Sequence, residues 1–373
     1  MNAYRIVEVP APAAADVTPT PAYLAISEIE AEHGRETVGH EDLADPPERL
    51  VAAAVPQRHS RHIHLIAVSD DVTDQPSEPA QVLGVASLDL PMDDNTHFAE
   101  LWIGVRAAHR RRGIGRELWR AAEEHVLSHG RTTVAGWSAH GGEATEAEEA
   151  VHAESGVGRI RAADAAAIFA RRLGFTLEQT ERQSTLRLPI DPQTLQAWRL
   201  EAQSVAGQDY RLVQWVGRTP ERWLEEMAEL NRRMSTDVPM ADLDMQEESW
   251  DAGRVSDYDD RRELRGMQTV LSAAEHVPTG VLAAYTFVVL PRDKPEVAYQ
   301  ENTLVRAEHR GNRLGLLVKA ANVEQLADRF PQVRRIHTWN AGENEHMLAI
   351  NIRMGFQVAA VEGAWQLRLT PRG

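Results

Sequence analysis

Three arginines and two glycines stand together in RRRGIG, residues 110–115. The segment follows the apolar stretch ELWIGV (100–105) and precedes the helical pattern RELWRAAEEHVLSHG. Glycines allow a tight turn in which several backbone N–H groups point at one anion. The N-terminus of the following helix adds a partial positive charge. The pattern is typical of a pyrophosphate-binding loop; the alternative is a plain turn carrying three solvated arginines.

The pattern recurs 200 residues later, as expected for an internal repeat. The matched residues at this offset are Val105 and Val305, His109-Arg110 and His309-Arg310, and Gly115 and Gly315. Further along, Gly174-Phe175 matches Gly355-Phe356 at an offset of 181. The first copy therefore carries about 19 extra residues, which we assign to the Gly-rich, acidic stretch 138–159. The chain is a tandem duplication.

Both copies alternate helical and strand patterns. In the first copy we predict helices at 20–34, 45–54, 115–129 and 162–173, strands at 62–69, 82–90, 97–105 and 131–137, and a closing strand pair within 175–188. In the second copy we predict helices at 221–234, 316–330 and 344–355, strands at 268–274, 280–290, 297–305 and 334–339, and a closing pair near 356–361 and 364–369. The expected fold class is α/β (α+β), with two domains that each hold a mixed, mostly antiparallel sheet flanked by helices. We place the domains at 1–195 and 196–373, with the boundary inside 190–208.

Composition excludes several classes of protein. A chain of 373 residues with 43% hydrophobic and 26% charged residues suits two globular domains. The net charge of −16 argues against nonspecific nucleic-acid binding. No apolar run approaches the roughly 20 residues that span a bilayer, and no secretory signal begins the chain. Without cysteine there is no disulfide or thiolate nucleophile. We therefore expect a cytoplasmic monomer or homodimer that binds neither membrane nor nucleic acid.

The segment VRAAHRRRGIGRELW resembles motif A of the GNAT superfamily of N-acetyltransferases, whose Arg/Gln-x-x-Gly-x-Gly/Ala loop holds the pyrophosphate of acetyl-CoA. LVRAEHRGNRLGLLVK resembles the same motif, with Arg313 in place of the middle glycine; that replacement suits the loop if the backbone of Arg313 is ordinary. The resemblance covers nearly the whole chain, and the two-domain architecture resembles that of mycothiol synthase-like proteins. It implies acetyl-CoA as cofactor. The residues that it implies for binding are Val105, Arg110, Arg111, Arg112, Gly113, Ile114, Gly115 and Arg116 in the first copy, and Val305, Arg310, Gly311, Asn312, Arg313, Leu314, Gly315, Asn340 and Asn344 in the second.

A second family segment is similar to NEHMLAINIRMGF in the C-terminal copy. In the family, an Asn contacts the cofactor and a Tyr often protonates the leaving thiolate. Here Asn344 stands at the Asn position and Asn351 at the Tyr position; the corresponding residues in the first copy are Ala163 and Ala170. Neither copy has the usual acid.

Family bases often lie on the strand before motif A, which points to Glu100 and Glu301. Glu100 precedes Val105 by five residues and Glu301 precedes Val305 by four, so in regular strands they face opposite ways. At most one then occupies the usual place, and Gln300 is the counterpart of Glu100. The alternative is that each is a solvated strand residue.

Three further groups have competing interpretations. The acidic segment 234–251 offers Asp237, Asp242, Asp244 and Trp250 to a cationic acceptor, or is a polar loop. His62 and His64 share a strand face, as metal ligands can, but structural histidines explain them better. Glu343 and His346 either relay protons or start a helix.

The function expected from the resemblance is acetyl-CoA-dependent N-acetyltransfer to a small-molecule amine by direct transfer in a ternary complex. The C-terminal copy is expected to be catalytic because it keeps the helix next to the thioester. The alternatives are a non-catalytic acyl-CoA-binding or scaffolding protein, and a protein or peptide N-acetyltransferase.

Overall fold

The computed structural model describes residues 4–370, which form two compact units. Unit 1 comprises residues 4–181, 240–245 and 360–370, and unit 2 comprises residues 182–239 and 246–359. The units therefore do not coincide with the two halves of the sequence. The boundary at 195 stays a prediction of where the first duplicated segment ends. Each compact unit also contains chain from the other duplicated segment.

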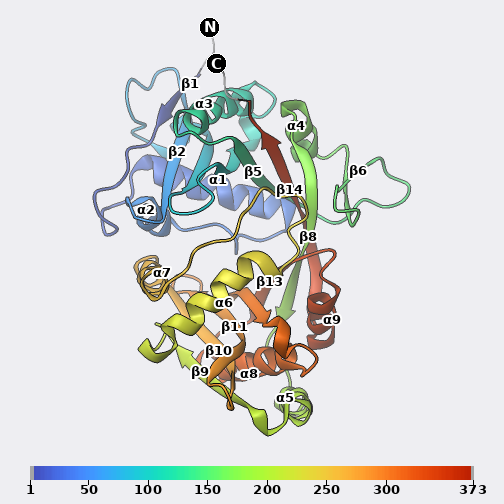
Figure 1. Cartoon of the computed structure of the whole chain (residues 1–373). Coiled ribbons are helices and arrows are strands. Elements are labelled where there is room, and N and C mark those ends of the chain that lie inside the picture. The colour runs from blue at the N-terminus through green and yellow to red at the C-terminus, as the bar shows by residue number, and fades with distance from the viewer. Residues whose placement is uncertain (1–3, 371–373) are drawn as a thin grey trace. The chain divides into compact units, whose positions relative to one another are not determined.

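Unit 1 alternates helices and strands along its chain (Figure 1). Its elements are β1 (Tyr4–Glu8), α1 (Pro21–Thr37), α2 (Pro47–Ala54), β2 (Ser60–Ser69), β3 (Val82–Pro91), β4 (Phe98–Val105), α3 (Ile114–Ser128), β5 (Thr133–His140), β6 (Ala150–His152), β7 (Arg159–Arg161) and α4 (Ala165–Leu173). β8 (Thr176–Arg187) and β14 (Gln357–Arg368) each contribute residues to both units.

Unit 2 repeats the arrangement, with one additional helix at its start. Its elements are α5 (Pro192–Ala206), β9 (Tyr210–Val216), α6 (Leu224–Asp237), α7 (Ala252–Leu264), β10 (Met267–His276), β11 (Val281–Pro291), β12 (Val297–Val305), α8 (Leu314–Arg329), β13 (Arg335–Ala341) and α9 (Glu345–Met354).

Each unit is built on a mixed sheet with mostly antiparallel neighbours, which confirms the predicted fold class. The strand order is β1-β2-β3-β4-β5-β14-β8 in unit 1 and β8-β13-β12-β11-β10-β9 in unit 2. β4 with β5 and β12 with β13 run parallel. A helix connects each parallel pair, as such a connection requires.

The closing strand of each copy lies in the other copy's sheet. β14, drawn in red among the blue and green strands of unit 1 in Figure 1, pairs with β5 from Val361↔His140 to Arg368↔Thr133. β8 lies next to β13 in unit 2. The predicted closing pairs are wrong, because β8 and β14 are single strands of 12 residues. Neither segment has a turn sequence in its middle, and the one glycine, Gly363, lies within β14.

The helices α5 and α7 and the strands β1, β6, β7 and β9 were not predicted. The short strands β1 and β9 both begin with Tyr-Arg. Each is an edge strand, β1 paired with β2 and β9 paired with β10, so they belong to the repeat. The expected linker 190–208 is instead the 15-residue helix α5, whose N-cap Asp191 accepts a hydrogen bond from the backbone N–H of Thr194. Pro192 at the first helical position also favours a helix start. The extra residues of the first copy form the two-stranded sheet of β6 and β7.

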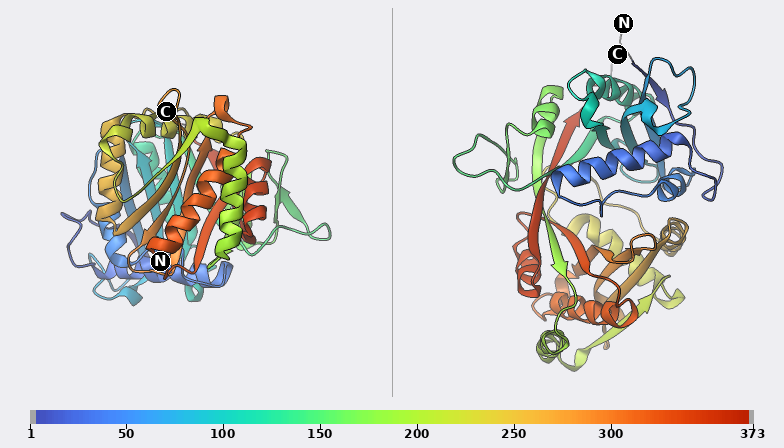
Figure 2. Two further views of the ribbon diagram at one scale, coloured as in Figure 1. Left: turned by 90° about the horizontal axis from the view of Figure 1, so that it is seen from below. Right: turned by 180° about the vertical axis from the view of Figure 1, so that it is seen from behind.

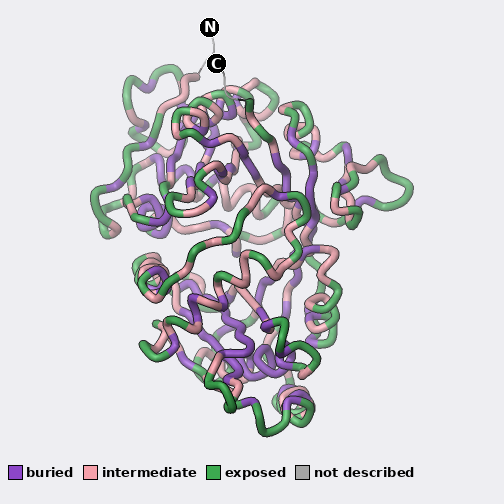
Figure 3. Tube along the Cα trace, in the orientation of Figure 1, coloured by how far each residue is buried: buried purple, intermediate pink, exposed green. Residues whose placement is uncertain are grey.

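Apolar residues line both faces of each sheet, and Figure 3 shows the strands as largely buried. In unit 1 one face packs against α3 and the other against α1 and α2. In unit 2 the corresponding faces pack against α8 and against α6 and α7. Among the described residues, no helix combines the length and apolarity that crossing a membrane requires.

Candidate functional site

Each unit has a loop between its fourth strand and the following helix, and we call residues 106–115 loop 1 and residues 306–315 loop 2. In loop 1 the backbone is left-handed at Arg111 (φ +63°) and Gly113 (φ +86°). In loop 2 it is left-handed at Gly311 (φ +85°) and Arg313 (φ +53°). The sequence-based expectation that Arg313 suits the loop required an ordinary, right-handed or extended backbone at this residue. Its φ of +53° does not meet that requirement. The two loops nevertheless have the same shape, because equivalent positions are left-handed in both. Glycine occupies the second of these positions in loop 1 and the first in loop 2.

This shape leaves the loop N–H groups without protein acceptors. Within the described chain, no hydrogen bond is recorded for the backbone N–H groups of 111–115 or 311–315. The first N–H groups of α3 and α8 lack intrahelical partners in any case. Several donors and a helix N-terminus thus meet at one point, as an anion requires.

The last glycine of each motif permits close contact between two helices. A Cβ at Gly115 would lie 3.3 Å from the ring of Phe169 on α4. A Cβ at Gly315 would lie 3.0 Å from Ile350 on α9, which is the equivalent position. The repeat preserves these glycines because each loop-bearing helix packs directly on the next helix.

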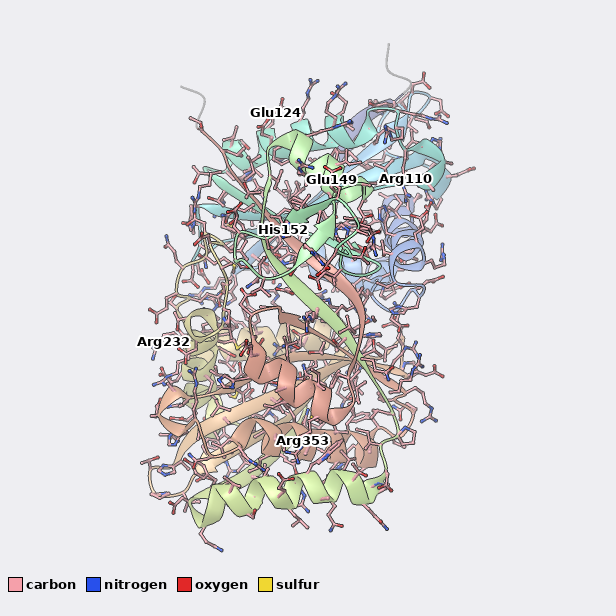
Figure 4. All side chains as sticks on the ribbon, turned by 90° about the vertical axis from the view of Figure 1, so that its right-hand side faces the viewer. Arg110, Glu124, Glu149, His152, Arg232 and Arg353 are labelled. Atoms are coloured by element: carbon pink, nitrogen blue, oxygen red, sulfur yellow. The ribbon has the colours of Figure 1, made fainter. Side chains whose placement is uncertain are left out.

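The first arginine of each motif has a structural role. Arg110 donates to the carbonyl of Val105 at 2.9 Å and to Glu36, at the end of α1, at 2.6 Å. Arg310 makes the corresponding contacts with Val305 and Asp237, both at 3.4 Å. Figure 4 labels Arg110 in unit 1. These side chains hold the strand end to a helix. Arg111 and Arg112 of loop 1 and Arg116 in the first turn of α3 are exposed.

The fourth and fifth strands of each unit separate after a short pairing. β4 and β5 pair over three positions, ending at Glu100↔Ala135, although both strands continue. β12 and β13 also pair over three positions, ending at Tyr299↔His337. The backbone groups beyond these points have no ladder partner on the facing strand. An acyl group entering the gap therefore meets main-chain N–H groups, the type of donor that stabilises an oxyanion.

A β-bulge changes the comparison between Glu100 and Glu301. Pairing of β11 with β12 is regular to Thr286↔Thr303 and resumes at Val288↔Gln300, so Glu301 and Asn302 both lie opposite Phe287. β3 and β4 pair without a bulge. The prediction that the two glutamates face opposite ways is therefore wrong, because the inserted residue shifts the alternation.

The bulge also corrects the assigned counterparts. Tyr299 pairs with His337 as Glu100 pairs with Ala135, so Tyr299, rather than Gln300, is equivalent to Glu100. Glu100 lies half-buried opposite Asp89, on the face that carries α1. Glu301 lies on the corresponding face of unit 2, but closer to loop 2 along the strand.

Glu301 is the candidate base with the more perturbed surroundings. Its side chain is exposed, but the nearby protein removes enough water to raise the pKa of its carboxyl, opposed by the positive charges of Arg262 and Arg265. Beside it in the bulge, Asn302 hydrogen-bonds the buried Tyr285, whose hydroxyl donates to Asn231 at 3.1 Å. Burial raises the pKa of Tyr285, which keeps this phenol protonated.

The predicted residues of α9 hold one another. Asn351, at the expected Tyr position, is buried and donates to Asn340 of β13 at 2.6 Å. A carboxamide has no proton of suitable acidity for a thiolate. Asn344 is the N-cap of α9 and accepts from the N–H of Met347 at 3.2 Å. The equivalent N-cap of α4 is Asp164, one residue beyond the Ala163 that the sequence offset selected.

Helix α5 covers the face of unit 2 that has loop 2 at one end. Figure 2 shows α5, in lime, beside the orange α8 and the red α9. Glu201 of α5 accepts hydrogen bonds from Arg313 of loop 2 and from Arg353, labelled in Figure 4. A protein carboxylate therefore already pairs with the arginine of this loop. Loop 1 has no such pairing at Arg111 within the described residues.

The other sequence candidates divide between the two units. Asp237 pairs with Arg310, and the indole of Trp250 donates to Glu248 and lies 4.5 Å from the Arg254 guanidinium. Asp242 and Asp244 belong to unit 1, where Asp244 accepts from Thr133 at 2.8 Å.

Both strand histidines have structural surroundings. His64 is buried against Ser87, and burial lowers its pKa to about 4. His62 lies 3.7 Å from Asp89. At the start of α9, Glu343 and His346 stay predictions without a tested role.

Two mixed sheets, each with a separated parallel strand pair and a loop with left-handed backbone at a helix N-terminus, define a tandem GNAT fold. Residues 25–156 match the model of the acetyltransferase (GNAT) family. The chain therefore contains a GNAT acetyltransferase domain, and acyl transfer is the reaction class that this match supports.

Solved structures extend the likeness of fold to the whole chain. A tandem GNAT protein from the clavulanic acid biosynthesis pathway, solved without AcCoA, is 22% identical with a TM-score of 0.71, over 99% of this chain and 100% of that one. A GCN5-related N-acetyltransferase from Sphaerobacter thermophilus is 14% identical with a TM-score of 0.60, over 98% and 96% of the two chains. A glucosamine N-acetyltransferase region of a fungal GH3 β-N-acetylglucosaminidase is 14% identical with a TM-score of 0.59, over 98% of this chain and 38% of that one. No curated protein sequence matches the chain.

Proposed function

We propose that the protein is an acetyl-CoA-dependent N-acetyltransferase and that loop 1 of unit 1 binds the pyrophosphate of acetyl-CoA. The observation that carries this proposal is the contrast between the loops. Loop 1 combines five N–H groups without protein acceptors with the exposed Arg111 and Arg112, and the exposed Arg116 follows in α3. In loop 2, Arg313 is already paired with Glu201. This contrast supports unit 1 as the donor site, whereas the sequence favoured the C-terminal copy as the catalytic one.

The residues present suit the proposed substrate. A pyrophosphate accepts several hydrogen bonds and carries negative charge, which backbone N–H groups and arginines complement. The thioester then extends into the gap between β4 and β5, where main-chain N–H groups polarise its carbonyl. The acceptor is an amine, for which we propose a small molecule. A cytoplasmic monomer or homodimer is the proposed state.

Direct transfer in a ternary complex is the proposed default route. It needs a base for the amine and an acid for the departing sulfur. On the strands preceding the loops, Glu100 in unit 1 and Glu301 in unit 2 are the candidate bases. The position of the usual acid is Ala170 in unit 1 and Asn351 in unit 2. Neither side chain supplies a proton to the thiolate.

Matched glycine variants test which loop binds the donor. Gly113→Val forces a β-branched residue to φ +86°, which we expect to weaken CoA binding about tenfold or more in calorimetry, since left-handed backbone costs an L-residue about 1–2 kcal/mol. Gly311→Val applies the same strain to loop 2, and we expect CoA binding like that of the wild type. Gly130→Val, at φ +71° after α3, controls for strain alone. Loss of binding in Gly311→Val but not Gly113→Val would move the donor site to unit 2.

A non-catalytic acyl-CoA-binding protein is the second candidate, and the replacement of the usual tyrosine by Ala170 and Asn351 favours it. Thiol release from acetyl-CoA separates the candidates. Release with a panel of small amines supports the transferase, and release only with peptides supports a peptide N-acetyltransferase. CoA binding without release supports the non-catalytic protein.

A further inference from the structure

A serine, a histidine and an aspartate form a hydrogen-bonded relay in unit 1. The Oγ of Ser138 lies 2.8 Å from Nε2 of His140, and Nδ1 of His140 lies 2.7 Å from Oδ2 of Asp164. Ser138 and His140 are two residues apart on β5 and share a face. This is the arrangement of a nucleophile, a base and a residue that orients the base.

The surrounding donors fix the direction of the protons. The indole N–H of Trp365 donates to Ser138 Oγ at 2.8 Å, so the serine proton is free to point elsewhere. An ionised Asp164 only accepts, which places the proton of a neutral His140 on Nδ1. Burial lowers the pKa of His140, opposed by the hydrogen bond and charge of Asp164, so the neutral imidazole is favoured. Nε2 therefore accepts the proton of Ser138.

Asp164 hydrogen-bonds the histidine instead of capping the N-terminus of α4. It stands at the N-cap of α4, where an aspartate commonly accepts an N–H of the first turn, yet its side chain makes no capping bond. Its counterpart Asn344 does cap α9. The side chain of His140 is 1% exposed, which confines the imidazole between Ser138 and Asp164. Ser138 is only half-buried.

The relay lies where the proposed thioester would enter. Pairing of β4 with β5 ends at Ala135, so Ser138 belongs to the separated part of β5. The sheet register makes Asn340 the unit 2 equivalent of Ser138, and Asn340 bonds Asn351. The equivalent of Asn351 is Ala170. By the repeat, Ser138 is therefore expected to lie next to Ala170. The small alanine stands where the family has its acid, and it leaves room for a ligand.

We propose that Ser138 is an acyl-accepting nucleophile, so that transfer proceeds through an acetyl-serine ester in place of the direct route. The proposal rests on the proposed function for its donor, acetyl-CoA. Ser138 Oγ forms a bond to the thioester carbonyl carbon while Nε2 of His140 takes the hydroxyl proton. The carbon–sulfur bond then breaks, and the sulfur takes that proton from His140 and leaves as CoA thiol.

The second half regenerates the enzyme. The amine nitrogen attacks the serine ester and gives a proton to His140, the carbon–oxygen bond to Ser138 breaks, and the serine oxygen takes the proton back. The products are the acetylated amine and the free serine. His140 thus supplies the acid function that Ala170 lacks.

The first test does not depend on acetyl-CoA. A fluorophosphonate probe reacts with base-activated serines, and we expect peptide mass spectrometry to find the label on Ser138 of the full-length protein. His140→Gln and Asp164→Asn should slow labelling about 10²- to 10⁴-fold, as loss of general-base assistance does. The control is Ser128→Ala, because Ser128 is an exposed serine 3.3 Å from His129 without the relay. Absence of label on Ser138 in the folded wild type overturns the proposal.

The second test uses acetyl-CoA without acceptor. We expect one CoA released per chain in a rapid burst and one acetyl group on Ser138, both lost in Ser138→Ala. If Ser138→Ala binds CoA and acetylates amines at the wild-type rate, the nucleophile proposal fails while the proposed function stands. If the wild type neither binds nor cleaves acetyl-CoA but Ser138 still takes the fluorophosphonate, the proposed function fails and the activated serine stands.

A further variant guards against loss of folding. The chain contains no cysteine, so Ser138→Cys introduces a single thiol. A thiol beside the His140 base should react with iodoacetamide at neutral pH faster than a free cysteine, and His140→Gln in that background should remove the acceleration. Equal rates in both backgrounds would contradict the relay.

Discussion

Loops 1 and 2 show how a duplicated motif keeps a backbone shape while its sequence changes. Loop 1 places Arg111 and Gly113 in the left-handed region, and loop 2 places Gly311 and Arg313 there. Each loop therefore retains one residue whose Cβ opposes the conformation. The strain persists on the residue that also brings positive charge to the loop.

Arg111→Gly tests this strain. Removing the Cβ at φ +63° should stabilise unit 1 by up to about 1 kcal/mol, because an L-residue pays about that much in the left-handed region. The measurement is the urea midpoint of unfolding. Arg112→Gly is the matched control, since Arg112 is not among the positive-φ residues, and it should give no gain. An increase of similar size in both variants would attribute the gain to lost charge repulsion.

His64 should give unit 1 a pH-dependent stability. Burial lowers its pKa to about 4, well below the 6.5 of an unfolded chain. The unfolded state therefore binds the proton first, so this contribution is present above about pH 6.5 and is lost as pH falls towards 4. We expect His64→Gln to reduce the dependence of the thermal-unfolding midpoint on pH between about pH 4 and 6.5. The exposed His152 provides the control His152→Gln, and an equal reduction there would exclude burial as the cause.

At the scale of elements, α5 distinguishes unit 2 from unit 1. Glu201 on this helix engages Arg313 and Arg353 at once, and these arginines hold its pKa below the usual value. The helix therefore offers loop 2 an internal anion. Since α5 follows β8 directly, it replaced the linker that the sequence pattern led us to expect.

Glu201→Gln should expose a second anion site. Without the carboxylate, Arg313 and the free N–H groups of loop 2 are available, and we expect titration with inorganic pyrophosphate to show about one more bound anion per chain. Glu324→Gln is the matched control, because Glu324 pairs with Arg199 of α5 at 2.8 Å and leaves Arg313 untouched. Unchanged stoichiometry in Glu201→Gln would mean that loop 2 cannot bind an anion.

Local pattern predicted most elements because helices and strands have distinct periods. It could not predict the bulge at Glu301, since one inserted residue leaves no periodic signal and yet reverses the face of the residues before it. The Ser138 relay was missed for another reason. Ser138 and His140 lie at the start of a stretch that we assigned to an insertion, and Asp164 reaches them only through the fold.

The exchange of closing strands was equally invisible in the sequence. β8 and β14 occupy equivalent positions in the two copies, and nothing in either sequence states whether the strand pairs within its own copy. The pairing of β14 with β5 is determined by the tertiary fold and is seen only in the folded chain. At the scale of the molecule, each compact unit therefore needs chain from both copies.

That requirement predicts the behaviour of a nicked chain. Gly207 and Gln208 are exposed between α5 and β9, so a protease site inserted there should be cleaved in the native state. The N-terminal piece would hold β8 and α5 for unit 2, and the C-terminal piece would hold β14 for unit 1. We expect the pieces to co-elute in size-exclusion chromatography without denaturant and to separate in urea, and each piece expressed alone to lack cooperative unfolding. A native N-terminal piece that elutes alone and unfolds cooperatively would show that β5 does not need β14.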